Sequence, residues 1–113
     1  MAIGVDIEEI NRFENKSQKF LDRIYTKEEQ EYCLSKACPA SHFAVRFCAK
    51  EAVTKALNSM RIKQPGLNKI EIQHDENNCP LVKLPLQEEF LNLNVDVSLS
   101  HDRTKAIAFV IVS

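Results

Sequence analysis

Ten residues near the middle of the chain decide its fold: Arg46-Phe47-Cys48-Ala49-Lys50-Glu51-Ala52-Val53-Thr54-Lys55. They lie in the longest stretch without proline or glycine that also has a helical pattern, from about Ser41 to Leu57. At about 3.6 residues per turn, apolar side chains cover nearly the whole circumference of this predicted helix. Such a helix is normally buried on several sides. We therefore expect a central helix around which the rest of the chain packs.

The same helix carries four charged side chains, at Arg46, Lys50, Glu51 and Lys55. Buried charges are costly unless they are paired or bound to a ligand, so these residues are the first indication of a functional site. A simpler alternative is that Glu51 and Lys55, four residues apart with the acid first, form an ordinary surface pair worth about 0.2–0.5 kcal/mol. Only partners elsewhere in the chain can decide between the two interpretations.

Length and composition indicate one small soluble domain. The 113 residues suffice for one modest core, so we expect a single domain over residues 1–113. Fifteen basic and sixteen acidic residues nearly balance, and we expect no nucleic-acid partner. We expect no membrane segment and no signal peptide, because no apolar run approaches ~18 residues and the first residues lack a basic region. Four cysteines without C-x-x-C spacing favour free thiols in a cytoplasmic protein.

The first residues predict a strand that ends near a carboxylate. Ile3, Val5 and Ile7 alternate with small or acidic residues, which is strand periodicity. Asp6 then lies on the face opposite to the aliphatic side chains. Taken alone, an acid at this place is an ordinary solvated residue.

Three short helical segments are predicted between this strand and the central helix. They cover about 8–15, a piece around 20–24, and a helix from Thr26 to about Lys36. Thr26 and Glu29 form the T-x-x-E pattern of a capping box. Pro39 separates the third segment from the central helix, which Ser41 could cap.

After Leu57 the pattern changes to strands. Residues 70–72 and 81–84 predict a hairpin around a polar turn, and a short helix is possible over 86–91. Two further strands, 95–99 and 106–112, flank the turn 101–104. Helices early in the chain and antiparallel hairpins later predict an α+β fold rather than a doubly wound sheet.

Three separated polar signals remain: Asp6, the charged residues of the central helix, and Ser98-Leu99-Ser100-His101-Asp102 at a predicted hairpin. Two carboxylates suit a hard cation such as Mg²⁺, which keeps several waters and shares its shell with substrate phosphates. Lysine and histidine beside such a cation suit phosphate oxygens and a leaving diphosphate. This mixture favours phosphoryl-type transfer over acyl transfer, although a lone His101 in a turn is more often a plain surface histidine.

Together these motifs resemble those of the holo-acyl-carrier-protein synthases, the small bacterial type of 4′-phosphopantetheinyl transferase. Ile3-Gly4-Val5-Asp6-Ile7 resembles the family's glycine–aliphatic–aspartate strand. Arg46 to Lys55 resembles its R-F-A-A-K-E-A-x-x-K helix, and Val97 to Asp102 resembles its V-S-I/L-S/T-H motif. The three motifs occur in the family's order and span essentially the whole chain. One of them alone would be weak, whereas three in register are specific.

The resemblance implies a fold and an activity. The fold is an antiparallel sheet packed against a long central helix, in a homotrimer with sites between protomers. The activity is Mg²⁺-dependent transfer of 4′-phosphopantetheine from coenzyme A to a serine of apo acyl carrier protein, which releases adenosine 3′,5′-bisphosphate. This reaction belongs to fatty acid biosynthesis in the cytoplasm.

The resemblance also implies roles for individual residues. Asp6 and Glu51 would hold Mg²⁺, and Lys55 would neutralise the phosphates and assist the leaving group. Glu51, or a water on the metal, would take the serine proton. Further contacts to the coenzyme A phosphates would come from His101, Arg46 and Lys50. The acidic carrier protein would dock on Arg12, Lys19, Phe20 and Arg23.

One stretch departs from the family pattern, and two other functions stay open. The family usually has a glycine in the loop after its helix motif, close to coenzyme A, whereas residues 58–63 contain none before Gly66. Asn58 could adopt the left-handed conformation there. The alternatives are a non-catalytic module that binds carrier proteins and a different Mg²⁺-dependent nucleotide enzyme. The presence of Asp6, Glu51 and Lys55 together argues against the first.

Overall fold

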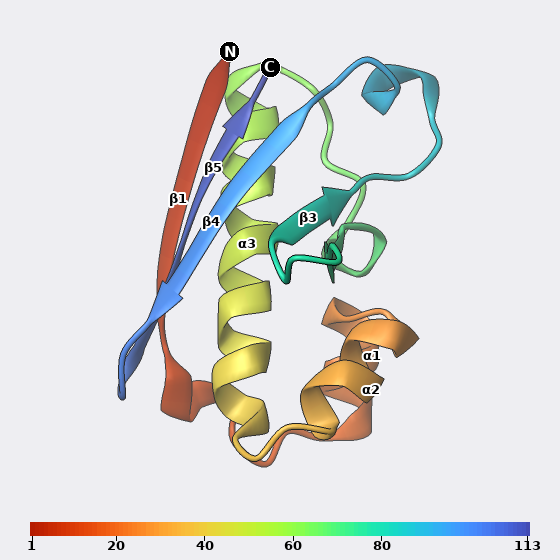
Figure 1. The fold of residues 1–113 in the computed structure, drawn as a ribbon. Coiled ribbons are helices and arrows are strands. Elements are labelled where there is room, and N and C mark those ends of the chain that lie inside the picture. Colours follow the sequence, from red (N-terminus) through yellow and green to blue (C-terminus); the bar gives the residue numbers. More distant parts are fainter.

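The computed structural model describes residues 1–113 as an α+β fold built on one long helix (Figure 1). The regular elements are β1 (Ala2–Glu9), α1 (Gln18–Ile24), α2 (Lys27–Leu34), α3 (Pro39–Ser59), β2 (Glu71–His74), β3 (Pro80–Lys83), β4 (Val95–His101) and β5 (Lys105–Val112). Short 3₁₀ turns cover Ile10–Phe13, Leu67–Lys69 and Glu88–Phe90. The predicted α+β class and both antiparallel hairpins are confirmed. Of the helix predicted over 86–91, only the 3₁₀ turn forms.

The helix α3 lies between two layers, which explains why it is apolar nearly all round. An antiparallel sheet with the order β1-β5-β4 runs along one side of it. The helices α1 and α2 and the separate β2–β3 hairpin lie along the other side (Figure 1). Buried apolar side chains from both layers form one core cluster with α3. No helix of the structure is both long and apolar enough to cross a membrane.

Both ends of α3 differ from the prediction. The helix begins at Pro39, not after a cap at Ser41, because proline suits the first helical position, where its missing N–H has no partner to lose. The Ser41 hydroxyl instead donates to the carbonyl of Cys38 (3.0 Å).

The end of α3 is closed by a Schellman motif. Arg61 N donates to Asn58 O (3.0 Å) and Ile62 N donates to Leu57 O (2.9 Å). The left-handed residue is Arg61, with φ 61°, whereas Asn58 stays helical. The suggestion that Asn58 supplies the left-handed conformation was therefore wrong, and an arginine occupies a position that usually takes glycine.

The strand β1 turns its aliphatic side chains away from α3. Ile3, Val5 and Ile7 are 62%, 49% and 57% exposed, while the opposite face of the strand lies against the helix. Gly4 makes this contact possible, because a Cβ at Gly4 would lie only 1.9 Å from the carbonyl oxygen of Ala52. As predicted, Asp6 lies opposite to the aliphatic side chains. It faces α3 and is not a solvated strand acid.

The helix α2 begins as predicted. Thr26 and Glu29 form a complete capping box, and the helix ends at Leu34, slightly before the expected Lys36. Glu29 is nevertheless only 2% exposed, which is unusual for a capping acid. Besides capping α2, its carboxylate accepts a hydrogen bond from Lys50 on α3.

Candidate active site

Lys50 is fully buried and its ammonium group is saturated. Its Nζ donates to Glu29 Oε1 (2.6 Å), Leu67 O (3.0 Å) and Ile70 O (2.5 Å). Burial lowers the pKa of Lys50, while the charge of Glu29 and its hydrogen bond oppose this shift. An ammonium group has three donors, so Lys50 has none left for a phosphate. The expectation that Lys50 contacts coenzyme A phosphates is corrected here: the residue is structural.

Glu29 joins three elements at this junction. Besides Lys50, it accepts from the backbone N–H groups of Thr26 (2.9 Å) and Ile72 (2.8 Å). The Glu29–Lys50 pair thereby connects α2, α3 and β2. Buried charges with this many partners hold a fold in place, because removing one partner leaves the other uncompensated.

A second charged cluster lies where β1 crosses α3. Lys55 Nζ donates to Val5 O (2.9 Å) and to Asp6 Oδ1 (3.3 Å). The side chain of Lys55 is 54% exposed, whereas that of Asp6 is 12% exposed. Lys55 thus pairs with the strand and not with Glu51 on its own helix, so the simple helix-pair interpretation does not hold.

The acids of this cluster outnumber its cations. Asp6 Oδ2 is buried and has no hydrogen-bond partner. Burial raises the pKa of Glu51, the charge of Asp6 raises it further, and Lys55 opposes the shift. Unpaired buried carboxylate oxygens beside a second carboxylate are a place where a cation would relieve repulsion.

Glu8 is an acid of this cluster that the sequence analysis missed. It lies two residues after Asp6 on β1 and therefore on the same face of the strand. Burial, followed by the neighbouring carboxylate of Asp6, raises the pKa of Glu8 to about 7, and the charge of Arg12 opposes this shift. Its carboxylate accepts a hydrogen bond from Arg12. Strand periodicity alone could have revealed Glu8.

The residues of the cluster fit a magnesium ion that keeps much of its water. No group of three or more His, Cys, Asp or Glu side chains is arranged as a metal site in the structure. Asp6 and Glu51 nevertheless offer carboxylate oxygens, one of them unpaired. Mg²⁺ is usually bound through one or two carboxylates plus water and substrate phosphates. The donor set is therefore of the kind this ion uses.

Arg46 lies on another side of α3 and is 2% exposed. Its Nη1 donates to His42 O (3.2 Å), and its Nη2 lies 3.4 Å from His74 Nδ1. Its Nε is buried without a partner. The guanidinium lies 4.3 Å from the ring centre of Tyr32.

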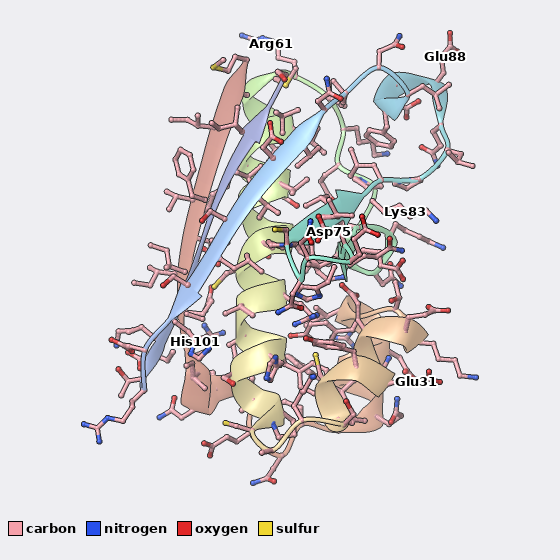
Figure 2. All side chains as sticks on the ribbon, in the orientation of Figure 1. Glu31, Arg61, Asp75, Lys83, Glu88 and His101 are labelled. Atoms are coloured by element: carbon pink, nitrogen blue, oxygen red, sulfur yellow. The ribbon has the colours of Figure 1, made fainter.

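His101 shares a cavity with Arg46. The cavity has a volume of about 390 Å³, and residues of α2, α3, β2 and β4 line it. Figure 2 shows His101 at the end of β4, and its Nδ1 lies 3.2 Å from Asp102 O. Arg46 and His101, two of the residues expected to contact coenzyme A phosphates, therefore line one cavity of a single chain.

The structure does not bring all the predicted site residues together in one chain. On an α-helix, Glu51 lies roughly 140° around the axis from Arg46. Glu51 and Lys55 face β1, whereas Arg46 contacts α2 and β2. The predicted residues thus fall in two places. Asp6, Glu51 and Lys55, joined by Glu8, form a carboxylate–lysine cluster. Arg46 and His101, joined by His42 and His74, line an arginine–histidine cavity.

The predicted carrier-docking residues lie on the first two helical segments. Arg12 is in the 3₁₀ turn after β1, and Lys19, Phe20 and Arg23 are on α1. The three basic residues are exposed and Phe20 is half-buried. Lys16 lies over the Phe20 ring at 5.1 Å and adds a further positive charge.

Comparison with known proteins identifies the family. A model of the 4′-phosphopantetheinyl transferase superfamily matches residues 2–110. The holo-acyl-carrier-protein synthase of Chlorobaculum parvum is 40% identical over 116 residues, which cover 99% of this chain and 97% of the relative. That of Thermodesulfovibrio yellowstonii is 38% identical over 118 residues, with 99% and 97% covered.

Solved structures agree with the sequence relatives. The Helicobacter pylori holo-acyl-carrier-protein synthase in complex with coenzyme A matches with a TM-score of 0.82 and 33% identity, over 98% of this chain and 99% of that one. The Bacillus anthracis synthase in complex with CoA (3′,5′-ADP) matches with a TM-score of 0.82 and 29% identity, over 98% and 94%.

The fold and the matched residues define a transferase of the 4′-phosphopantetheinyl type. Within that superfamily, the chain belongs to the holo-acyl-carrier-protein synthase family. The resemblance seen in the three sequence motifs is confirmed.

Proposed function

We propose that this chain transfers 4′-phosphopantetheine from coenzyme A to a serine of apo acyl carrier protein, with Mg²⁺ as cofactor, and releases adenosine 3′,5′-bisphosphate. The observation that carries the proposal is the carboxylate–lysine cluster, in which the unpaired Asp6 oxygen lies beside Glu51 and Lys55. All three residues belong to the family's motifs. Coenzyme A in the complexes of the Helicobacter pylori and Bacillus anthracis synthases supports the choice of donor.

Each residue of the cluster has a chemical task in this reaction. Asp6 and Glu51 would hold Mg²⁺, which supplies positive charge to the diphosphate when bound. Glu51, whose pKa is raised, would accept the proton of the carrier serine. The serine oxygen forms a bond to the phosphorus that bears pantetheine, and the bond from that phosphorus to the adenosine bisphosphate breaks. Lys55 would stabilise the charge that develops on the leaving phosphate.

We propose that a homotrimer completes the site. The outer face of the sheet pairs apolar residues across β1 and β5: Ile3 with Ile111, Val5 with Phe109, and Ile7 with Ile107. Exposed apolar surface of this kind is typical of an interface between subunits. A neighbouring protomer could then bring its arginine–histidine cavity to the carboxylate–lysine cluster of this chain.

Docking of the carrier would use the basic surface of Arg12, Lys19 and Arg23 around Phe20. The carrier protein is acidic, so opposite charges would guide the encounter. The reaction would take place in the cytoplasm, where thiols stay reduced, and the four cysteines are free.

A transfer assay tests the reaction. Purified protein, coenzyme A and apo carrier are mixed with Mg²⁺ or with a chelator, and the molecular mass of the carrier is measured by mass spectrometry. The proposal requires a mass increase of one phosphopantetheine that depends on the cation. Carrier binding without a mass increase would indicate a binding module, and competition by other nucleotides would indicate a different nucleotide enzyme.

Mixing two inactive variants tests the shared site. Asp6→Asn removes a function of the carboxylate–lysine cluster and Arg46→Gln removes one of the arginine–histidine cavity. If different protomers contribute the two, co-refolding equal amounts should restore roughly a quarter of the wild-type rate, the fraction of interfaces with both groups intact in a random trimer. Sites contained within one chain would give no recovery, and light scattering measures the oligomer directly.

A further inference from the structure

All three histidines of the chain line one cavity, next to an arginine with an unused donor. His42 on α3, His74 at the end of β2 and His101 at the end of β4 line the arginine–histidine cavity. Arg46 lines it too, with its Nε buried and unpaired. A buried guanidinium N–H without an acceptor is costly, and native structures rarely leave one so. Arg46 is also in none of the ion pairs of the chain, so its charge beside the cavity is not neutralised by a carboxylate.

The Tyr32 ring gathers two of these histidines with two permanent cations. His74 stacks on Tyr32 with ring centres 5.2 Å apart, and His42 meets the ring edge-on at 5.8 Å. The Arg46 guanidinium and the Lys36 ammonium lie 4.3 Å and 4.5 Å from the same ring centre. Arg46 and Lys36 are charged at every physiological pH, whereas each histidine adds charge only when protonated.

The surroundings of His42 oppose its protonation. Burial lowers the pKa of His42, and the charges of Arg46, Lys36, His101 and His74 lower it further. The charged groups that shift it most are all basic. A dianion placed among these groups would reverse the balance, because it attracts the proton that the cations repel.

His74 has similar surroundings, except that one acid, Asp75, also acts on it. Burial, Arg46 and Lys36 lower the pKa of His74, and Asp75 opposes them. The acids of the adjoining cavity on this side are Glu28, Glu29 and Glu71. Glu29 is paired with Lys50, and Glu71 accepts hydrogen bonds from Thr26 and Gln73. Two of the three are thus already engaged.

We propose that His42 and His74, in their protonated form, bind a phosphomonoester of the donor substrate beside Arg46, so that the affinity for the donor rises as the pH falls through neutrality. The inference rests on the proposed function, in which the donor is coenzyme A. In that function the diphosphate of coenzyme A binds at the carboxylate–lysine cluster. The phosphate that remains to bind in this cavity is the terminal monoester of coenzyme A. Neither histidine lies in the three sequence motifs.

Binding and protonation are then linked. A ligand that raises the pKa of a group takes up protons when it binds, and its affinity changes by up to about tenfold per pH unit for each proton. The monoester itself loses charge below its second pKa of about 6, so the effect should be clearest above that pH.

Titration calorimetry of the wild-type protein with saturating Mg²⁺ tests this at pH 6.5 and pH 8.0. Coenzyme A should bind about three- to tenfold more tightly at the lower pH. Repeating the titration in two buffers of different ionisation enthalpy should show net proton uptake. 3′-Dephospho-coenzyme A, which lacks only the monoester, should show neither effect.

Variants assign the effect to the two histidines. In a His42→Asn/His74→Asn protein the difference between the two pH values should shrink to within about twofold. Lys36→Gln is the comparison variant, because it removes a permanent charge beside the same ring and keeps both histidines. It should weaken binding at both pH values while net proton uptake on binding remains. Thermal unfolding verifies that each variant is folded. The measurement of proton uptake uses the wild-type protein alone, so it tests the proposal even if a variant does not fold.

Two outcomes would overturn the proposal while leaving the transferase function intact. One is a wild-type affinity that is equal at both pH values, without proton uptake, in a protein that still modifies the carrier. The other is a folded double variant that keeps the wild-type pH dependence. A wild-type protein that binds neither donor would overturn both proposals together.

Discussion

Lys50 and Lys55 lie on the same helix, yet their surroundings are opposite. Lys50 is completely buried and all three of its donors are used by Glu29 and two carbonyl groups. Lys55 is 54% exposed and shares its carboxylate partner with no other cation. Lys50 therefore holds α3 to α2 and β2, whereas Lys55 remains available to a ligand.

The acids of the two regions differ in the same sense. Glu29 accepts hydrogen bonds from Lys50 and from two backbone N–H groups. Asp6 has one buried oxygen without any partner, and the pKa values of its neighbours Glu8 and Glu51 are raised. A charge with all its partners inside the chain is structural, and a charge that lacks one is a candidate for function.

The largest expected effect is on the buried region. Lys50→Met should lower the free energy of unfolding by about 3–5 kcal/mol, because it leaves Glu29 buried and uncompensated. Urea unfolding followed by circular dichroism measures the loss. The double variant Lys50→Met/Glu29→Gln should recover part of it, and a loss below about 1 kcal/mol would show that Lys50 does not hold the layers together.

Lys55→Met should have the opposite profile. We expect kcat to fall by roughly 10²–10³, the usual scale for losing one well-placed electrostatic group, while coenzyme A still binds. Stability should change by only about 0–1 kcal/mol, as for an exposed ion pair. Lys55→Arg should rescue poorly, because a planar guanidinium does not replace a compact ammonium.

A second exposed lysine, Lys105, provides the control for this prediction. Lys105→Met removes an exposed lysine that pairs with Glu9 at the surface, and it should leave kcat unchanged. Steady-state kinetics and thermal unfolding are measured on the same preparations. Wild-type kcat in Lys55→Met would reduce Lys55 to a surface partner of Asp6.

Glu8 gives a pH-dependent distinction between the two regions. Its folded pKa of about 7 lies above the ordinary value of 4.5. Below pH 4.5, Glu8 is protonated in both the folded and the unfolded state and does not lower the free energy of unfolding. As the pH rises through 7, Glu8 ionises in the fold beside Asp6, and stability is lost. In metal-free protein, Glu8→Gln should therefore raise the thermal midpoint more at pH 8 than at pH 5.

Two comparisons sharpen the Glu8 prediction. Glu9→Gln is the matched control, because Glu9 is 48% exposed and pairs with Lys105, and it should show no such trend. Adding Mg²⁺ should reduce the difference between wild type and Glu8→Gln, since a bound cation offsets the repulsion. Equal pH profiles for wild type and Glu8→Gln would mean that Glu8 is not part of the cluster.

The sequence was sufficient for much of this picture. Periodicity predicts β1, α3 and both hairpins, and the T-x-x-E pattern predicts the capping box, because these signals are local. The position of Asp6 opposite to the aliphatic face of β1 follows from alternation alone. Which of the two faces meets α3 does not follow, because it depends on the contact between Gly4 and Ala52.

The separate fates of Lys50 and Lys55 could not be predicted from the sequence. Both lie in the same motif, and only the packing of α2 and of the segment Leu67–Ile70 uses up the donors of Lys50. The Arg46 cavity has the same origin, since His42, His74 and His101 come from three elements that are distant in sequence. Long-range contacts of this kind leave no periodic signal.

The smallest expected effect concerns the surface next to the carboxylate–lysine cluster, where Arg12 binds Glu8. Arg23→Glu should raise the KM for the carrier by roughly fivefold, about 1 kcal/mol, without changing the KM for coenzyme A. Salt should have the same effect on the wild type, because the Debye length shortens from ~10 Å at 0.1 M to ~3 Å at 1 M.

Arg12→Glu should raise the same KM and, in addition, lower stability above pH 7, because Glu8 then loses its cation and faces another acid. Arg23 is exposed on α1 and has no such link, so only Arg12→Glu should combine the kinetic and the pH-dependent change. Kinetics at two salt concentrations and thermal unfolding at pH 5 and pH 8 measure both. If neither Arg12→Glu, nor Arg23→Glu, nor added salt changes the KM for the carrier, the carrier docks on another face. If the two variants share one pH profile, Arg12 does not connect the docking surface with the carboxylates.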